Sequence, residues 1–152
     1  MMTIGIDPGK GGGVVFIRNR SVANAFKCPE SPILLVKLIR EQTKGFRKKR
    51  AMIEQVHSMP RDGVVSAFSF GRNYGEWLGI LAALNIPTTH VRPQVWQKYY
   101  GKLPKEKKSR KHKLKDLAYE LYPGAKNTLA TADAVLIGHY YLNLGVINAG
   151  IF

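Results

Sequence analysis

The chain has 152 residues, which is enough for one domain with a hydrophobic core and too few for two ordinary domains. Lys and Arg number 24 against 10 Asp and Glu, and the formal charge of +14 predicts attraction to polyanions, of which nucleic acid is the commonest. The single cysteine excludes an internal disulfide, and no apolar run reaches the length of a transmembrane helix. We therefore expect a single domain over residues 1–152 that acts in the cytoplasm and has no membrane partner.

The first part of the chain predicts three strands, a helix and a fourth strand. Short apolar runs that end at turn residues indicate strands, and the apolar spacing after Ser31-Pro32 is that of a helix. Asn19 and Arg20 lie at the tight turn expected between the second and third strands. The predicted strands span residues 3–7, 12–19, 21–28 and 51–56, and the helix spans residues 31–43.

The second part of the chain predicts alternating helices and one more strand. The helices are expected over residues 64–84, 113–123 and 131–147, and the strand over residues 88–93. A three-strand meander followed by alternating strands and helices indicates an α/β fold with a mixed five-stranded sheet flanked by helices. This is the element order of the ribonuclease H-like fold.

Three of the few acidic residues interrupt apolar segments. Asp7 ends the first strand, Glu54 lies between Ile53 and Val56 in the fourth, and Asp133 lies near the start of the last helix. Each has a structural explanation on its own, because Asp7 could organise the turn that follows it and Asp133 could favour a helix N-terminus.

Together the three acids suggest a metal site. If they meet at one edge of the sheet, their mutual repulsion raises their pKa values and weakens the fold unless a cation compensates them. Mg²⁺ and Mn²⁺ prefer such oxygen ligands, and one or two ions could serve phosphodiester cleavage on a strongly basic protein.

Five segments resemble, in order, the signature segments of RuvC-type Holliday junction resolvases, and the resemblance is closest to the bacteriophage branch. They are "GIDPGKGG", "IEQVHSMPRDGV", "FGRNYGEWLGILAAL", "VRPQVWQK" and "TADAVLIGHYY", and they cover nearly the whole chain. The resemblance implies a homodimeric, Mg²⁺-dependent nuclease that makes paired nicks in four-way DNA junctions and leaves 5′-phosphate and 3′-hydroxyl ends. It also implies a bacterial or phage-infected host cell and a place near the nucleoid.

The resemblance assigns roles residue by residue. Asp7, Glu54 and Asp133 match acids that bind the metal and carry catalysis. The family supplies a further ligand three or four positions before the last acid, where this chain has Ala130 and Leu129, neither of which can bind a metal. We expect the second ion to bind less tightly for this reason. His139 is too far along the helix from Asp133 to replace that ligand.

Basic residues gather in two runs. The run from Lys102 to Lys115 is expected beside the metal site, and its phosphate contacts would raise affinity without reading bases. The run from Lys44 to Arg50 suggests a second surface for another duplex arm. A solvated charged face is the alternative for such runs. The DNA-binding residues that we predict are Lys10, His57, Arg72, Lys105, Lys107, Lys108, Arg110, Lys111 and Lys113.

Two of these residues and one helix have alternatives of their own. His57 matches a position where cellular resolvases carry an aromatic residue that stacks on junction bases, but it could equally cap a strand. Lys10 could touch the scissile phosphate or remain an exposed loop residue. The helix over residues 64–84 carries Gly71, Gly75 and Gly79 at four-residue spacing, which favours a two-fold contact between copies of the chain.

Three functions remain open from the sequence. The first is the structure-selective DNA endonuclease, the second a ribonuclease that acts on RNA–DNA hybrids, and the third a junction-binding protein that no longer cuts. Junction-selective, metal-dependent nicking distinguishes the first from the other two.

Overall fold

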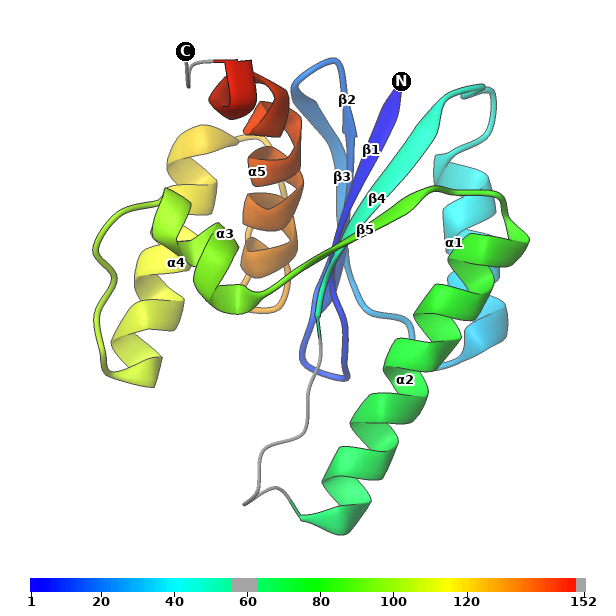
Figure 1. Cartoon of the computed structure of the whole chain (residues 1–152), viewed down its shortest axis with the longest axis horizontal. Coiled ribbons are helices and arrows are strands. Elements are labelled where there is room, and N and C mark those ends of the chain that lie inside the picture. The colour runs from blue at the N-terminus through cyan, green and yellow to red at the C-terminus, as the bar shows by residue number, and fades with distance from the viewer. Residues whose placement is uncertain (56–62, 150–152) are drawn as a thin grey trace.

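The computed structural model describes residues 1–55 and 63–149 and contains a five-stranded sheet between two layers of helices (Figure 1). The strands are β1 (Met2–Asp7), β2 (Gly13–Arg18), β3 (Ser21–Lys27), β4 (Lys49–Glu54) and β5 (Thr88–Val91). The helices are α1 (Pro32–Gln42), α2 (Val64–Ala83), α3 (Pro93–Tyr99), α4 (Lys107–Leu121) and α5 (Ala132–Ala149). The predicted α/β fold with a mixed five-stranded sheet is confirmed.

The sheet has the order β3-β2-β1-β4-β5. β1, β2 and β3 form the antiparallel meander, and β4 and β5 run parallel to β1. Asn19 and Arg20 both have positive φ at the β2–β3 turn, as a tight hairpin turn requires. The carboxyl ends of β1, β4 and β5 consequently meet at one edge of the sheet.

Alternating side chains divide the core between the two faces of the sheet. Ile4, Ile6 and Ile53 pack with α1 and α2, whereas Val15 and Met52 pack with α3, α4 and α5. In Figure 1 the two helical layers cover opposite faces of the sheet. Because successive strand residues point to opposite faces, the parity of each position decides which helices its side chain meets.

Helix α5 lies directly on β1 because two residues there have no side chain. A Cβ atom at Gly5 would come within 2.3 Å of the Ala134 backbone oxygen, and Gly138 faces the Gly5 backbone from the helix. This close contact brings the start of α5 to the strand that carries Asp7.

Helix α4 begins earlier than the sequence predicted, at Lys107 instead of residue 113. The Glu106 side chain accepts hydrogen bonds from the backbone N–H groups of Lys108 (2.8 Å) and Ser109 (2.6 Å), which caps the helix. The basic run therefore forms the first turns of a helix. Within the described parts of the chain, no helix has the length and apolar character needed to cross a membrane.

Candidate active site

The end of the sheet places Asp7 and Glu54 next to each other. Ile6 of β1 pairs with Ile53 of β4 in a parallel register, and Asp7 and Glu54 are the next residues of the two strands. Ile6 and Ile53 both point toward α1 and α2. By alternation, Asp7 and Glu54 project toward the other face, where α5 lies.

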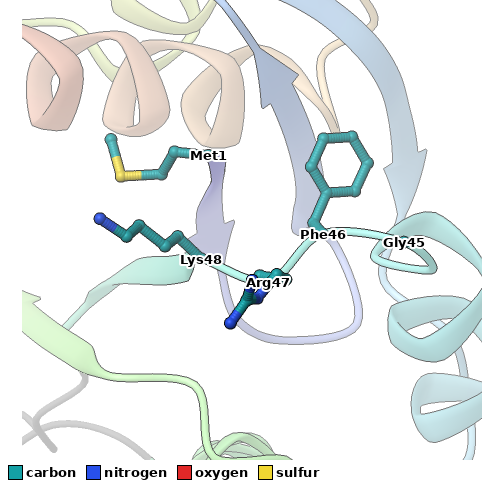
Figure 2. Close-up of a pocket in the computed structure, with 5 residues that line it drawn as sticks. All are labelled: Met1, Gly45, Phe46, Arg47 and Lys48. Atoms are coloured by element: carbon teal, nitrogen blue, oxygen red, sulfur yellow. The ribbon is translucent and has the colours of Figure 1, made fainter.

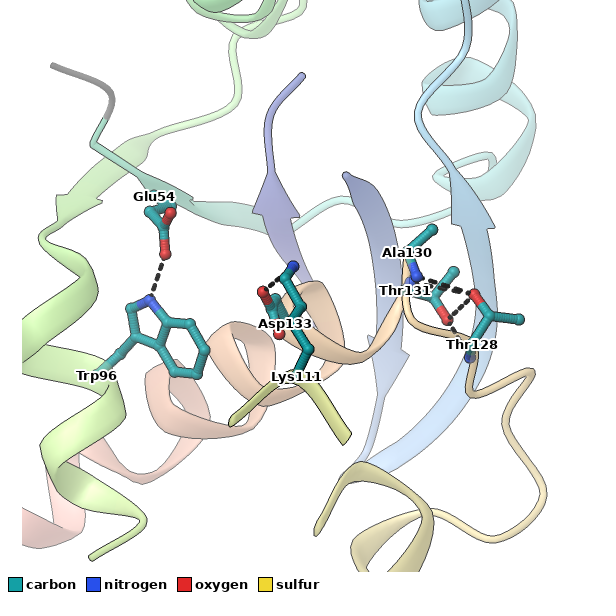
Figure 3. A network of polar contacts seen from close by, with 7 residues as sticks. All are labelled: Glu54, Trp96, Lys111, Thr128, Ala130, Thr131 and Asp133. Carbon is teal, nitrogen blue, oxygen red and sulfur yellow. Dashed lines mark hydrogen bonds and ion pairs between the residues drawn. The ribbon is translucent and has the colours of Figure 1, made fainter. Parts of the chain in front are cut away.

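Asp133 comes to this face from the first turn of α5. It is 7% exposed and belongs to an almost uninterrupted run of buried residues over 131–138. The Thr128–Thr131 turn precedes the helix, and the Thr131 hydroxyl donates to the Lys126 backbone oxygen at 2.6 Å. Thr128 and Thr131 thus hold this turn together (Figure 3).

The three acids are close enough to influence one another. Burial raises the pKa of Asp7 well above its usual value, and the charges of Asp133 and Glu54 raise it further. The charge of Lys111 acts in the opposite direction. A buried carboxylate that faces two others is a place where a cation is strongly favoured.

The turn after Asp7 does not depend on the Asp7 carboxylate. Gly12 N–H donates to the Gly9 backbone oxygen (3.1 Å), and Gly9 N–H donates to the Asn73 side-chain oxygen (2.8 Å). Among residues 1–55 and 63–149, no hydrogen bond joins that carboxylate to the turn. The turn-organising explanation of Asp7 therefore lacks support from the contacts.

Two of the acids are held by neighbours that the sequence analysis did not connect with them (Figure 3). Trp96 Nε1 donates to Glu54 Oε2 at 2.6 Å. Lys111 Nζ donates to Asp133 Oδ2 at 2.8 Å, while Asp133 Oδ1 is buried and has no hydrogen-bond partner in the described structure. Burial lowers the pKa of the Lys111 amine, but the charge of Asp133 and the other acids more than offsets this and raises it.

The donor chemistry and the charge of this cluster fit a hard divalent cation. Three carboxylates from three elements are the ligand type that Mg²⁺ and Mn²⁺ prefer, and the orphaned Asp133 Oδ1 has an unused lone pair. In the described part of the chain, no three acidic, His or Cys side chains are already arranged around one ion position. Glu54 and Asp133 are instead hydrogen-bonded to Trp96 and Lys111.

The positions before Asp133 supply no further acid. Leu129 is 44% exposed, and Ala130 lies in the capping turn, so neither is part of α5, which begins at Ala132. His139 Nδ1 is hydrogen-bonded to the Tyr122 hydroxyl at 2.8 Å, so its hydrogen-bond partner is a tyrosine and not one of the three acids.

The basic face of α4 adjoins the acids through Lys111. Lys105, Lys107, Lys108 and Lys113 are exposed, and none is in an ion pair within the described residues. Arg110 instead donates to the backbone oxygens of Pro104 (3.4 Å) and Lys105 (3.1 Å) and so supports the loop before the helix. The structure leaves the predicted DNA contacts of these residues untested.

A groove on the other side of the Asp7 turn contains two more predicted DNA contacts. Lys10 and Arg72 both line this groove of about 1220 Å³, between the β1–β2 turn and α2. Arg72 also forms an ion pair with Glu76 one helical turn later, with 3.6 Å between Arg72 Nε and Glu76 Oε1. His57 lies outside the described residues.

The second basic run lies at the opposite end of the sheet from the acids. Residues 45–48 with Met1 line a hollow of about 690 Å³ beside the amino ends of β1 and β4 (Figure 2). Met2 N–H donates to the Lys48 backbone oxygen at 2.9 Å, and Phe46 packs on the core, which fixes the loop. Because each strand residue advances the chain by about 3.3 Å, this basic loop lies roughly 20 Å from the acids.

Sequence reasoning missed Trp96 as a partner of Glu54 and gave Lys111 only a DNA role. Trp96 is fully buried and comes from α3, so its position beside Glu54 depends on how α3 packs on the sheet and has no local sequence signal. Lys111 is one lysine among several of similar setting, so no local signal distinguished it.

Comparisons with known proteins define the fold. No protein-family model matches the sequence, and no curated protein matches it. Thermus thermophilus RuvC in complex with a Holliday junction substrate has a similar structure, with a TM-score of 0.63 and 16% identity, covering 95% of this chain and 96% of that chain. Another structure of Thermus thermophilus RuvC gives a TM-score of 0.64 and 19% identity, covering 95% of this chain and 97% of that chain.

These similarities place the chain in the α/β class that has the ribonuclease H-like fold. Within that class, the particular fold is that of RuvC, as the five sequence segments predicted.

Proposed function

We propose that the chain is a metal-dependent, structure-selective DNA endonuclease that resolves four-way junctions and other branched DNA. The observation that carries the proposal is the meeting of Asp7, Glu54 and Asp133 at one edge of a RuvC-type sheet beside a basic helix. The expected products have 5′-phosphate and 3′-hydroxyl ends.

Asp7, Glu54 and Asp133 would hold Mg²⁺, for which Mn²⁺ could substitute. The ion, when bound, would act as a Lewis acid toward the phosphodiester. The rigid carboxyl ends of β1 and β4 keep two of these carboxylates in place more firmly than a loop would. The burial of Asp133 limits access of bulk water to the third.

The exposed lysines of α4 would bind the phosphates that flank the cleaved bond. They extend from the first turns of α4, whose N-terminus is capped by the Glu106 side chain. The basic run from Lys44 to Arg50, which includes the loop at residues 45–48 and the start of β4 and lies roughly 20 Å away, would contact a different duplex arm. Phosphate contacts of this kind depend on shape and charge rather than base sequence.

Cleavage of a labelled, immobile four-way junction tests the proposal. The junction is incubated with Mg²⁺ and with Mn²⁺, beside a linear duplex, an RNA–DNA hybrid and the variants Asp7→Asn and Asp116→Asn. Asp116 is exposed on α4 and provides a matched control for the loss of one carboxylate. We expect junction-selective paired nicks that fall at least about 100-fold in Asp7→Asn and persist in Asp116→Asn.

A second candidate function, junction binding without cleavage, is favoured by two observations. Leu129 and Ala130 provide no fourth ligand, and Glu54 and Asp133 are already hydrogen-bonded to Trp96 and Lys111. Retarded but uncut junction with both metals would support this candidate. Cleavage of the hybrid with indifference to the junction would instead support a ribonuclease.

A further inference from the structure

We infer that the Lys111 ammonium is a built-in second cation of the acid cluster, so that each chain binds one divalent ion at this site instead of two. The inference rests on the proposed metal-dependent function and concerns how the same site is completed. It follows from the contacts of Lys111, from the charge balance of the cluster and from the residues before Asp133.

Lys111 enters the acid cluster from outside the sheet. It lies on the second turn of α4, and its Nζ is 2.8 Å from Asp133 Oδ2. The Asp133 side chain is 10% exposed and that of Lys111 is 36% exposed, so the ion pair joins a buried carboxylate to an amine that water still reaches. The charges of Asp7 and Glu54 also act on this amine. A single ammonium thus interacts with all three carboxylates.

The charges of the cluster balance with one divalent ion. Three ionised carboxylates and one ammonium leave two net negative charges, which one Mg²⁺ or Mn²⁺ neutralises. In the DNA-free protein, a second divalent ion would leave the cluster with two net positive charges and no added ligand, because Leu129 and Ala130 offer none. Repulsion between the cations therefore opposes the binding of a second ion.

Lys111 also competes with the ion for Asp133. The ammonium occupies Oδ2, and only Oδ1 is left without a partner in the described structure. Removal of the ammonium frees the second oxygen and removes the repulsion between two cations. Loss of a lysine from the most negative part of the protein should therefore strengthen metal binding, whereas loss of any other lysine should have little effect.

The test measures Mn²⁺ binding to the DNA-free protein by calorimetry and by the free-ion signal in electron paramagnetic resonance. The variants are Lys111→Met, Lys111→Glu and the control Lys113→Met, which removes an exposed lysine two residues away. Asp7→Asn identifies binding at the acid cluster. The stability of each variant is measured in EDTA and in Mg²⁺ to confirm that it folds.

We expect one Mn²⁺ per wild-type chain, at least about tenfold tighter binding in Lys111→Met, and no more than about a twofold change in Lys113→Met. Lys111→Glu adds a fourth carboxylate to the cluster, so this variant should bind two ions per chain. A merely structural role for Lys111 would lower the stability of Lys111→Met in EDTA without tightening metal binding. If Lys111→Glu does not fold, the Lys111→Met affinity decides the question.

Two results overturn the inference, and they differ in what they say about the proposed function. Two ions in the wild type, or unchanged affinity in Lys111→Met, would contradict the role of Lys111 and leave the metal-dependent nuclease intact. Absence of any Mn²⁺ binding that depends on Asp7 would contradict both proposals.

Discussion

At the scale of single residues, Asp7 has a carboxyl group in a place that disfavours its ionised form. Burial, followed by the charges of Asp133 and Glu54, raises its pKa in the folded protein. Between the unfolded and the folded pKa, the folded chain binds more protons than the unfolded chain, so stability decreases as pH rises through this window. Above the window the unfavourable contribution is fully present. Without metal, we expect stability to increase as pH falls from neutrality through the raised pKa.

Asp7→Asn should remove this contribution. In EDTA at pH 7 the variant should unfold at a higher temperature than the wild type, because it has no carboxylate to ionise in a buried position next to two other acids. Thermal unfolding between pH 4.5 and 8 measures both effects, with Asp116→Asn as the control. An Asp7→Asn protein that is less stable than the wild type at neutral pH would show that the carboxylate is structural.

The three acids could be predicted from the sequence because each interrupts an apolar segment in a chain with few acids. Their partners could not. The Glu54–Trp96 bond joins residues from different elements, and so does the Lys111–Asp133 bond. Which tryptophan or lysine reaches an acid depends on how α3 and α4 pack on the sheet, and no local pattern encodes that packing.

At the scale of elements, the contact between α5 and β1 positions Asp133 relative to Asp7. A Cβ atom on residue 5 would lie 2.3 Å from the Ala134 oxygen and 2.5 Å from the Gly138 nitrogen. Both are backbone atoms, so the helix has to move away from the strand. We expect Gly5→Ala to lower the free energy of unfolding by about 1–3 kcal/mol.

Denaturant unfolding of Gly5→Ala measures this loss, and Gly11→Ala is the matched control because its Cβ would meet no atom within 4 Å. The same displacement separates Asp133 from Asp7, so Mn²⁺ affinity should fall in Gly5→Ala under conditions where it is still folded. Equal stability of the two variants would show that α5 adjusts without cost.

Apolar spacing and turn residues predicted the five strands and the helices α1, α2, α4 and α5, but not the short helix α3 (Pro93–Tyr99). The start of α4 was also missed, because its first turns contain lysines where the helix dipole disfavours cations. The Glu106 carboxylate compensates for these positive charges by capping the helix. Glu is a less common N-cap residue than Ser, Thr, Asp or Asn.

At the scale of the whole molecule, the element order predicted the fold, and the net charge predicted a polyanionic partner. A second copy of the chain has to be inferred from an exposed surface. Helix α2 extends past the sheet (Figure 1), and its first turns carry Val64, Val65 and Phe68 at 85%, 83% and 72% exposure. Trp77 and Leu81, in the second half of α2, are fully buried in the core.

We predict that the first half of α2 forms the contact of a homodimer. Large apolar side chains that lie together on a surface mark interaction sites, and an added Cβ at Gly71 or Gly75 would meet nothing in the single chain, which leaves room for a second helix. Phe68→Glu should convert the dimer to a monomer, as measured by light scattering during gel filtration. Tyr119→Glu adds the same charge at a residue 59% exposed on α4 and should remain dimeric.

Loss of the dimer has a consequence for the products of cleavage. Resolution of a symmetric junction requires two active sites related by a two-fold axis, and a monomer supplies one. On a plasmid with an extruded cruciform, the wild type should cut both strands within the lifetime of one complex and yield linear DNA, whereas Phe68→Glu should accumulate nicked circles. A monomeric wild type that still produces linear DNA at once would contradict the dimer, because one acid cluster would then have to cut both strands.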